Sequence, residues 1–219
     1  MYNFDTPNPI STVLNIPAAR VQLIAADRAD TVVEVLPADA SKSRDVKAAE
    51  QTTVEYTDGV LRIVTPVKHE ILGASGAIEV TVQLPSGSGV EGKTATAELR
   101  GVGRFGEVTH EAYGAIKIDE AASVRLTAQA GDVSVGRLTG PGEISTMQGD
   151  ITITEAVRGK VVLTTQAGNV TVGAAAGVSA SLDAGTTLGR IQNALKNTGA
   201  ADLEIHATTT QGDIAARSL

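Results

Sequence analysis

The sequence predicts an all-β protein, an elongated β-solenoid in which strand-turn-strand repeats of about 20 residues stack as in a β-helix. Three observations favour this fold. A glycine followed by Asp or Asn recurs at a nearly fixed spacing, apolar and polar residues alternate around it, and only 2% of the 219 residues are aromatic. A core with so few aromatic rings must be built from Val, Ile, Leu and Ala. Small and β-branched side chains suit narrow stacked layers.

The repeat is clearest in four copies that share a turn. The turn residues are Gly131 and Asp132, Gly149 and Asp150, Gly168 and Asn169, and Gly212 and Asp213. The first two steps are 18 and 19 residues, and the third is 44 residues, which is long enough for two steps. A degenerate copy with Leu182, Gly185, Gly189 and Ile191 is expected in that gap. Glycine reaches a positive φ without strain and Asp or Asn can bond its own backbone, which favours a tight turn.

Apolar residues lie five positions before each turn glycine and two and four positions after it. In the first three copies they are Leu126, Val133, Val135, Ile144, Ile151, Ile153, Leu163, Val170 and Val172. This period of two predicts strands with one buried face and one wet face. One copy cannot bury its apolar face alone, so the copies must stack. An antiparallel β-sandwich also fits two strands per repeat, but matched side chains between copies favour parallel stacking.

The residues before the array predict short strands and one helix. We expect strands over 12–16, 20–26, 31–36, 53–56, 60–64 and 78–84, and a helix over 44–50. The run Thr57-Asp58-Gly59 predicts a hairpin turn, and residues 66–77 have no clear period, which predicts a mobile loop. Because no linker is visible, we expect one continuous domain over 1–219. Residues 1–92 would form its cap and opening strands, and 93–219 the repeat array.

Composition narrows the classes of partner. A net charge of −7 argues against nucleic acid and anionic membrane surfaces. The absence of cysteine excludes disulfides and zinc-thiolate sites. No signal peptide and no apolar run of about 18 residues is visible, so we expect no membrane span and a cytoplasmic location.

The recurring motif G-D-[IV]-x-[IV], preceded by Thr and often Gln, carries a family resemblance. So do the N-terminal runs I-P-A-A-R-V and R-A-D-T-V-V-E-V-L-P-A-D. Together they resemble a bacterial β-strand-repeat family named "putative adhesins", a domain of unknown function. The resemblance covers most of the chain and implies an elongated β-repeat fold. The adhesin label is an analogy between folds, and a fold does not define a function.

Two repeated residue patterns are candidates for chemical or structural sites. Asp132, Asp150 and Asp213 could align as an acidic ladder for calcium, but one carboxylate per layer and an Asn in one copy favour a structural turn. The recurring glutamines Gln129, Gln148, Gln166 and Gln211 predict a side-chain ladder along the stack.

The remaining patterns predict no metal or cofactor. The histidines His69, His110 and His206 are scattered, without the spacing of metal ligands. Gly101, Gly103 and Gly106 form a loose G-x-G-x-x-G, but their flanks predict strands where a dinucleotide site needs a helix.

These observations predict a non-enzymatic structural or interaction protein, a rigid β-repeat scaffold that self-associates or binds a protein partner. We expect a homo-oligomer, because the copy around Gly212 leaves almost no chain to cap the array and its strand edges.

The alternative is a carbohydrate-binding or carbohydrate-active protein that uses an acidic stretch with the loop over 66–77. The stretch is Glu107–Glu120, and its acidic residues are Glu107, Glu111, Asp119 and Glu120. Sugar sites usually offer aromatic platforms, and only Phe105 and Tyr113 lie nearby in sequence, which disfavours this alternative.

Overall fold

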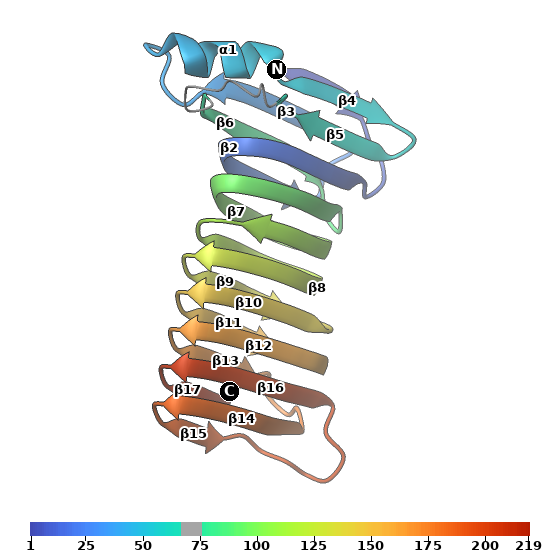
Figure 1. Ribbon diagram of the computed structural model, residues 1–219. Coiled ribbons are helices and arrows are strands. Elements are labelled where there is room, and N and C mark those ends of the chain that lie inside the picture. The colour runs from blue at the N-terminus through green and yellow to red at the C-terminus, as the bar shows by residue number, and fades with distance from the viewer. Residues whose placement is uncertain (67–75) are drawn as a thin grey trace. The chain divides into compact units, whose positions relative to one another are not determined.

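The computed structural model describes residues 1–66 and 76–219 (Figure 1). Most of the described residues lie in strands, which confirms the all-β prediction. The chain divides into two compact units, Met1–Tyr113 and Gly114–Leu219. The single continuous domain over 1–219 therefore stays a prediction. Most of the predicted loop over 66–77, with His69, lies outside the described residues.

The first unit combines long coiling strands with short antiparallel ones. Its elements are β1 (Tyr2–Asp5), β2 (Ser11–Ala26), β3 (Asp30–Pro37), α1 (Ser43–Gln51), β4 (Thr53–Thr57), β5 (Val60–Val64), β6 (Ile78–Pro85) and β7 (Gly89–Ala112). The first half of β2 pairs with β5, its second half pairs with β6, and β7 follows both halves in parallel. The strands predicted over 12–16 and 20–26 are therefore two halves of one strand. Pro17 cannot donate a ladder hydrogen bond, but Ile16 and Ala18 on either side of it both pair with β7.

Antiparallel strands complete the first unit. β3 pairs with both β1 and β6, and β4 pairs with β5. Asp58 and Gly59 have φ values of 51° and 79°, which confirms the predicted hairpin turn between β4 and β5. The predicted helix is also present as α1, and the buried Asp45 carboxylate accepts a hydrogen bond from the backbone N–H of Ala77 at 3.0 Å. That bond ties the helix to the start of β6.

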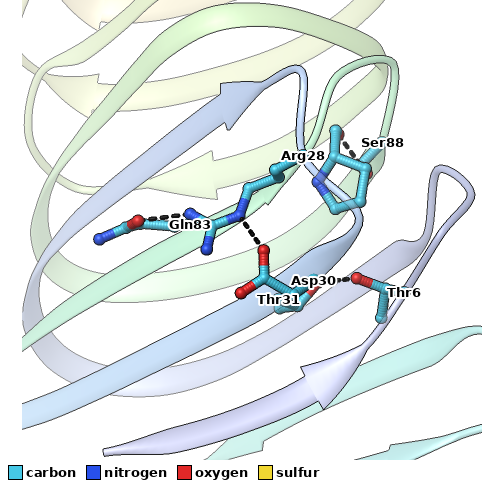
Figure 2. A network of polar contacts seen from close by, with 7 residues as sticks. Thr6, Arg28, Asp30, Thr31, Gln83 and Ser88 are labelled. Atoms are coloured by element: carbon cyan, nitrogen blue, oxygen red, sulfur yellow. Dashed lines mark hydrogen bonds and ion pairs between the residues drawn. The ribbon is translucent and has the colours of Figure 1, made fainter.

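A polar network fastens the turn between β2 and β3 (Figure 2). The Arg28 guanidinium donates to the Asp30 carboxylate at 2.9 Å and also to the side-chain oxygen of Gln83 on β6. The hydrogen bond from Arg28 lowers the pKa of the Asp30 carboxyl. Beside it, the buried hydroxyls of Thr6 and Thr31 lie 2.8 Å apart. The network therefore positions β3 against both β1 and β6.

The second unit is a stack of parallel strands. Its strands are β8 (Ile116–Ala130), β9 (Val133–Leu138), β10 (Gly142–Gln148), β11 (Ile151–Ala156), β12 (Gly159–Ala167), β13 (Val170–Ala174), β14 (Ala180–Leu188), β15 (Ile191–Ala194), β16 (Leu203–Gln211) and β17 (Ile214–Ser218). One face runs in the order β8, β10, β12, β16, β14, and the other runs β8, β9, β11, β13, β17, β15. Every one of these pairings is parallel, which confirms the solenoid and rules out the antiparallel sandwich.

The strand register matches the predicted repeat. Ile144 lies opposite Leu126 on one side and Leu163 on the other. Across the turn, Ile151 lies opposite Val133 and Val170. Their side chains are buried, so the core of this unit consists of rows of aliphatic residues, one from each layer. We call such a row an inner row.

The layers of the second unit depart from chain order (Figure 1). The copy around Gly212 forms β16 and β17, which pair with β12 and β13 on one side and with β14 and β15 on the other. The expectation that the copy around Gly212 ends the array is wrong, because the layers do not stack in chain order. The degenerate copy is the outer layer, formed by β14 and β15. Its Asn193 lies opposite Ala216 in an inner row, and this polar residue is tolerated because the position is exposed.

The predicted glutamine ladder is also wrong. Gln148 lies opposite Ala130 and Ala167, and Gln211 lies opposite Ala167 and Leu188. The reason is their spacing from the turn. Gln148 directly precedes its glycine, whereas Gln129 stands two residues before Gly131, so the two side chains fall into different rows.

Candidate functional site

The predicted turn glycines lie at one corner of the second unit. Gly131, Gly149, Gly168 and Gly212 have φ values of 144°, 140°, 154° and 148°. A Cβ atom on Gly149 would lie 2.3 Å from the carbonyl oxygen of Gly131, and one on Gly168 would lie 2.0 Å from that of Gly149. Both the backbone conformation and the spacing between layers therefore require glycine here.

The Asp and Asn residues that follow these glycines form a chain of hydrogen bonds from layer to layer, the Asx ladder. The acceptors are Oδ1 of Asp132, Asp150, Asn169 and Asp213, and the donors are the backbone N–H groups of Asp150, Asn169, Asp213 and Arg190. The distances lie between 2.7 and 2.9 Å. The Oδ1 atom of each of these side chains therefore already accepts a hydrogen bond from the backbone of the adjoining layer. In the described part of the chain, no cluster of three or more His, Asp or Glu is placed to hold a metal ion.

A second ladder was not predicted from the sequence. Thr146, Thr165, Thr209 and Thr186 donate their hydroxyls to the carbonyl oxygens of Gly131, Gly149, Gly168 and Gly212, at distances of 3.0 to 3.4 Å. We call this the threonine ladder. Its sequence signal is a Thr three residues before the glycine of its own copy, at 149, 168, 212 and 189. The hydroxyls satisfy carbonyls that the turn leaves without a strand partner.

The predicted acidic stretch is divided between the two units. Glu107 lines a hollow of about 350 Å³ in the first unit, the acidic hollow. The hollow is lined by Ser11, Gly89, Val90, Glu91, Glu107 and Thr109. Glu111 instead pairs with Lys93 at 2.6 Å, and the hydrogen bond from Lys93 lowers the pKa of the Glu111 carboxyl. Asp119 and Glu120 belong to the second unit.

The two described histidines lie in different settings and in different units. His110 is buried, with Nε2 3.1 Å from the Thr94 hydroxyl, and burial lowers the pKa of His110 to about 4. His206 is more exposed and lies 3.2 Å from Asp183. The glycines of the loose G-x-G-x-x-G, at 101, 103 and 106, lie inside β7, where no helix opens. Among the described residues, Glu107 and Glu111 therefore have different surroundings, and so do His110 and His206.

The outer layer of the second unit carries an exposed apolar residue. Ile191 belongs to an inner row whose other members are Ile116, Val133, Ile151, Val170 and Ile214. Those five side chains are 0–1% exposed, whereas Ile191 is 46% exposed. Among the described residues, β14 pairs only with β16 and β15 only with β17, so both strands have an edge without a strand partner. At the start of β14, the backbone N–H of Ala180 donates to the carbonyl oxygen of Lys196 at 3.0 Å.

Parallel coils, corner glycines and two hydrogen-bonded ladders define a β-solenoid repeat protein. The chain belongs to the Toastrack DUF4097 family, whose model matches residues 12–218. This membership confirms the resemblance to a domain of unknown function. No curated protein matches the chain.

The chain is also similar to solved structures of bacterial proteins that are named for adhesion. A "putative cell adhesion protein" from Clostridium sporogenes has 13% identity and a TM-score of 0.42, with 100% of this chain and 98% of that one covered. A "putative adhesin" from Bacteroides fragilis has 9% identity and a TM-score of 0.46, with 98% and 95% covered. One from Parabacteroides distasonis has 12% identity and a TM-score of 0.42, with 100% and 95% covered. Within the described residues, no helix is both long and apolar enough to cross a bilayer.

Proposed function

We propose that this chain is a non-enzymatic scaffold that acts by binding protein surfaces, those of a partner or of a second copy. The observation that carries the proposal is the Asx ladder. It ties the corner of each layer to the backbone of the adjoining one, from Asp132 to Arg190. Side chains and backbone that are already ordered lose little conformational entropy on binding, which favours recognition by a rigid surface.

The outward faces of the second unit support the same function. Neighbouring strands present opposite charges in register, with Arg125 3.5 Å from Glu143 and Arg137 3.5 Å from Glu155. Such exposed pairs contribute little to folding stability, but they hold charges of both signs at fixed spacing along the stack. Electrostatic patterns of this kind select partners and orient them.

Light scattering over a wide range of concentration, together with capture of purified candidate partners on the immobilised protein, tests the proposal. We expect either a mass above the 22.4 kDa of one chain or specific retention of a partner. The double variant Asp150→Ala and Asn169→Ala tests the contribution of the Asx ladder. It removes two ladder acceptors without changing the charged faces, so it should weaken binding. A protein that stays monomeric and retains no partner would overturn the proposal.

A second candidate function rests on the acidic hollow, where Glu91 and Glu107 line a space large enough for a sugar unit. This candidate is a carbohydrate-binding or carbohydrate-active protein. A glycan array and a polysaccharide-depolymerisation screen test it. Glu91→Gln and Glu107→Gln should reduce any signal, and Glu98→Gln, an exposed carboxylate of β7 outside the hollow, should not. Negative results in both assays would remove this candidate.

A further inference from the structure

We propose that the second unit pairs with a second copy of this chain through the free edges of its outer layer, β14 and β15, across a two-fold axis. The inference rests on the proposed scaffold function and names the surface and the partner. Its first support is the exposure of Ile191, because the five other residues of that inner row are buried. Leu182 repeats the pattern on the other face. It is half-buried, although Val161 and Ile205 of its row are buried.

The geometry of the outer layer favours a second copy of the chain as its partner. β14 and β15 lie on different faces of the unit and are joined by the corner at Gly189 and Arg190. A single extended peptide could add to one of these edges but would leave the other edge and the inner rows uncovered. A complete solenoid layer covers both edges and the inner rows at once. The outer layer of a second copy is such a layer.

The charge of the outer layer agrees with self-pairing. The chain carries a net charge of −7, but residues 180–194 contain only one acidic and one basic residue, Asp183 and Arg190. Two such layers therefore meet without net repulsion. The segment also lacks lysine and proline, the residues that commonly block edge-to-edge pairing. Pairing across a two-fold axis makes the strands antiparallel and uses both free edges of each copy, so it gives a closed dimer rather than a fibre.

Charge placed in the inner row tests the surface. We expect Ile191→Glu to raise the dimer dissociation constant at least about tenfold, since a buried unpaired carboxylate would lie at the centre of the interface. Gln192→Glu is the matched control. It adds the same charge to the next residue, which faces outward in the row of Thr171 and Ala215, and it should leave the dissociation constant within about twofold of wild type. Light scattering gives the masses, and circular dichroism checks that both variants fold.

Cysteine cross-linking tests the geometry, because the chain has no cysteine of its own. Single cysteines at Asp183, Gly185 and Thr187 sample the outward positions of β14. Ser145→Cys is the control, since Ser145 occupies the same outward row as Gly185 but lies in the interior strand β10. After mild oxidation, at least one β14 variant should give a disulfide-linked dimer at a yield well above that of the control.

The outcomes separate this inference from the proposed function. The inference is supported if Ile191→Glu loses the dimer, Gln192→Glu keeps it, and the β14 cysteine variants cross-link. A wild-type dimer that survives Ile191→Glu, or that cross-links no better through β14 than through Ser145→Cys, overturns it and leaves the scaffold function standing. If the wild-type protein is a monomer that retains a protein partner, the inference is overturned and the scaffold function stands. A monomer that retains no partner overturns both.

Discussion

At the scale of single residues, two kinds of residue define the corner of the second unit. The turn glycines leave room for the carbonyl oxygen of the adjoining layer, and the residues that follow them provide acceptors for the next backbone N–H. A substitution at the corner therefore acts on two layers, whereas a substitution on a strand's outward face acts on one.

We expect Gly149→Val to destabilise the protein by well over about 1 kcal/mol, because φ is 140° and the new Cβ would lie 2.3 Å from the Gly131 carbonyl oxygen. Thr152→Val, on the outward face of β11, should change the free energy of unfolding by less than about 0.5 kcal/mol. Thermal unfolding and amide exchange measure both variants. Unchanged protection in β10 and its two neighbouring strands after Gly149→Val would contradict this account of the corner.

The buried His110 makes the stability of the first unit depend on pH. Burial lowers its pKa from 6.5 to about 4, so below pH 6.5 the unfolded chain binds a proton that the folded chain does not. The contribution of neutral His110 is full above pH 6.5 and is lost as the pH falls towards 4, by up to about 3 kcal/mol.

We therefore expect His110→Gln to flatten the fall in unfolding free energy between pH 7 and pH 4.5. Urea unfolding at several pH values measures the slope, and His206→Gln, which replaces the more exposed histidine, is the control. Equal slopes for wild type and His110→Gln would show that His110 does not titrate on unfolding in this range.

At the scale of elements, hydroxyl groups are used in two ways on one strand. In β12, Thr165 points inward and joins the threonine ladder, and Thr164 points outward. The two residues are adjacent, so they share the same strand and the same layer. Their substitutions separate the contribution of the ladder from that of strand propensity.

Thr165→Val keeps the shape of the side chain but removes the donor to the Gly149 carbonyl oxygen, 3.1 Å away. We expect a loss of about 1–2 kcal/mol, because that acceptor is left without its partner. Thr164→Val should be nearly neutral, since its hydroxyl is exposed and valine favours strands. Urea unfolding compares the two variants, and equal losses would mean that the ladder contributes nothing specific.

The sequence predicts positions within a layer better than the order of layers. The two-residue period and the glycine spacing place Ile144 or Ile151 in its row, because side-chain alternation is a local property. No local property states which layer lies next to which, so the place of β16 and β17 could not be read from the repeat. The acidic hollow was missed for a related reason. Glu91 and Glu107 lie on β7 but are not close in sequence, and both line the hollow because the chain at Gly106 returns to the backbone of Gly87 and Ser88.

At the scale of the whole molecule, the stacks of strands in the two units end in different structures. The first unit has antiparallel hairpin strands, a helix and the paired rings of Phe4 and Tyr56, whose centroids lie 5.5 Å apart. The second unit has the outer layer, which is held only by the layer of β16 and β17. Stability in such arrays depends on contacts between neighbouring layers, so damage should spread outward from the inner layer.

A chain truncated after Asp202 tests this dependence. It keeps β14 and β15 in sequence but removes the strands that pair with them, so we expect residues 180–194 to lose amide protection. Leu182→Asp is the opposite case. It damages the outer layer and should leave protection in β16 largely intact, because β16 also pairs with β12. Protected amides over 180–194 in the truncated chain would contradict the dependence of the outer layer on β16 and β17.

The position of the layer formed by β16 and β17 also affects the order in which strands can pair during synthesis. Residues 180–194 leave the ribosome before residues 203–218, but their only strand partners among the described residues lie in that later segment. Until it emerges, the nascent chain holds an unpaired outer layer beside the bare edges of β12 and β13. Direct pairing of these two layers would give a wrongly ordered stack, which must open again before β16 and β17 can enter. We therefore expect refolding to contain a slow phase that disappears when β14 and β15 are deleted, as stopped-flow measurements on the two chains would reveal.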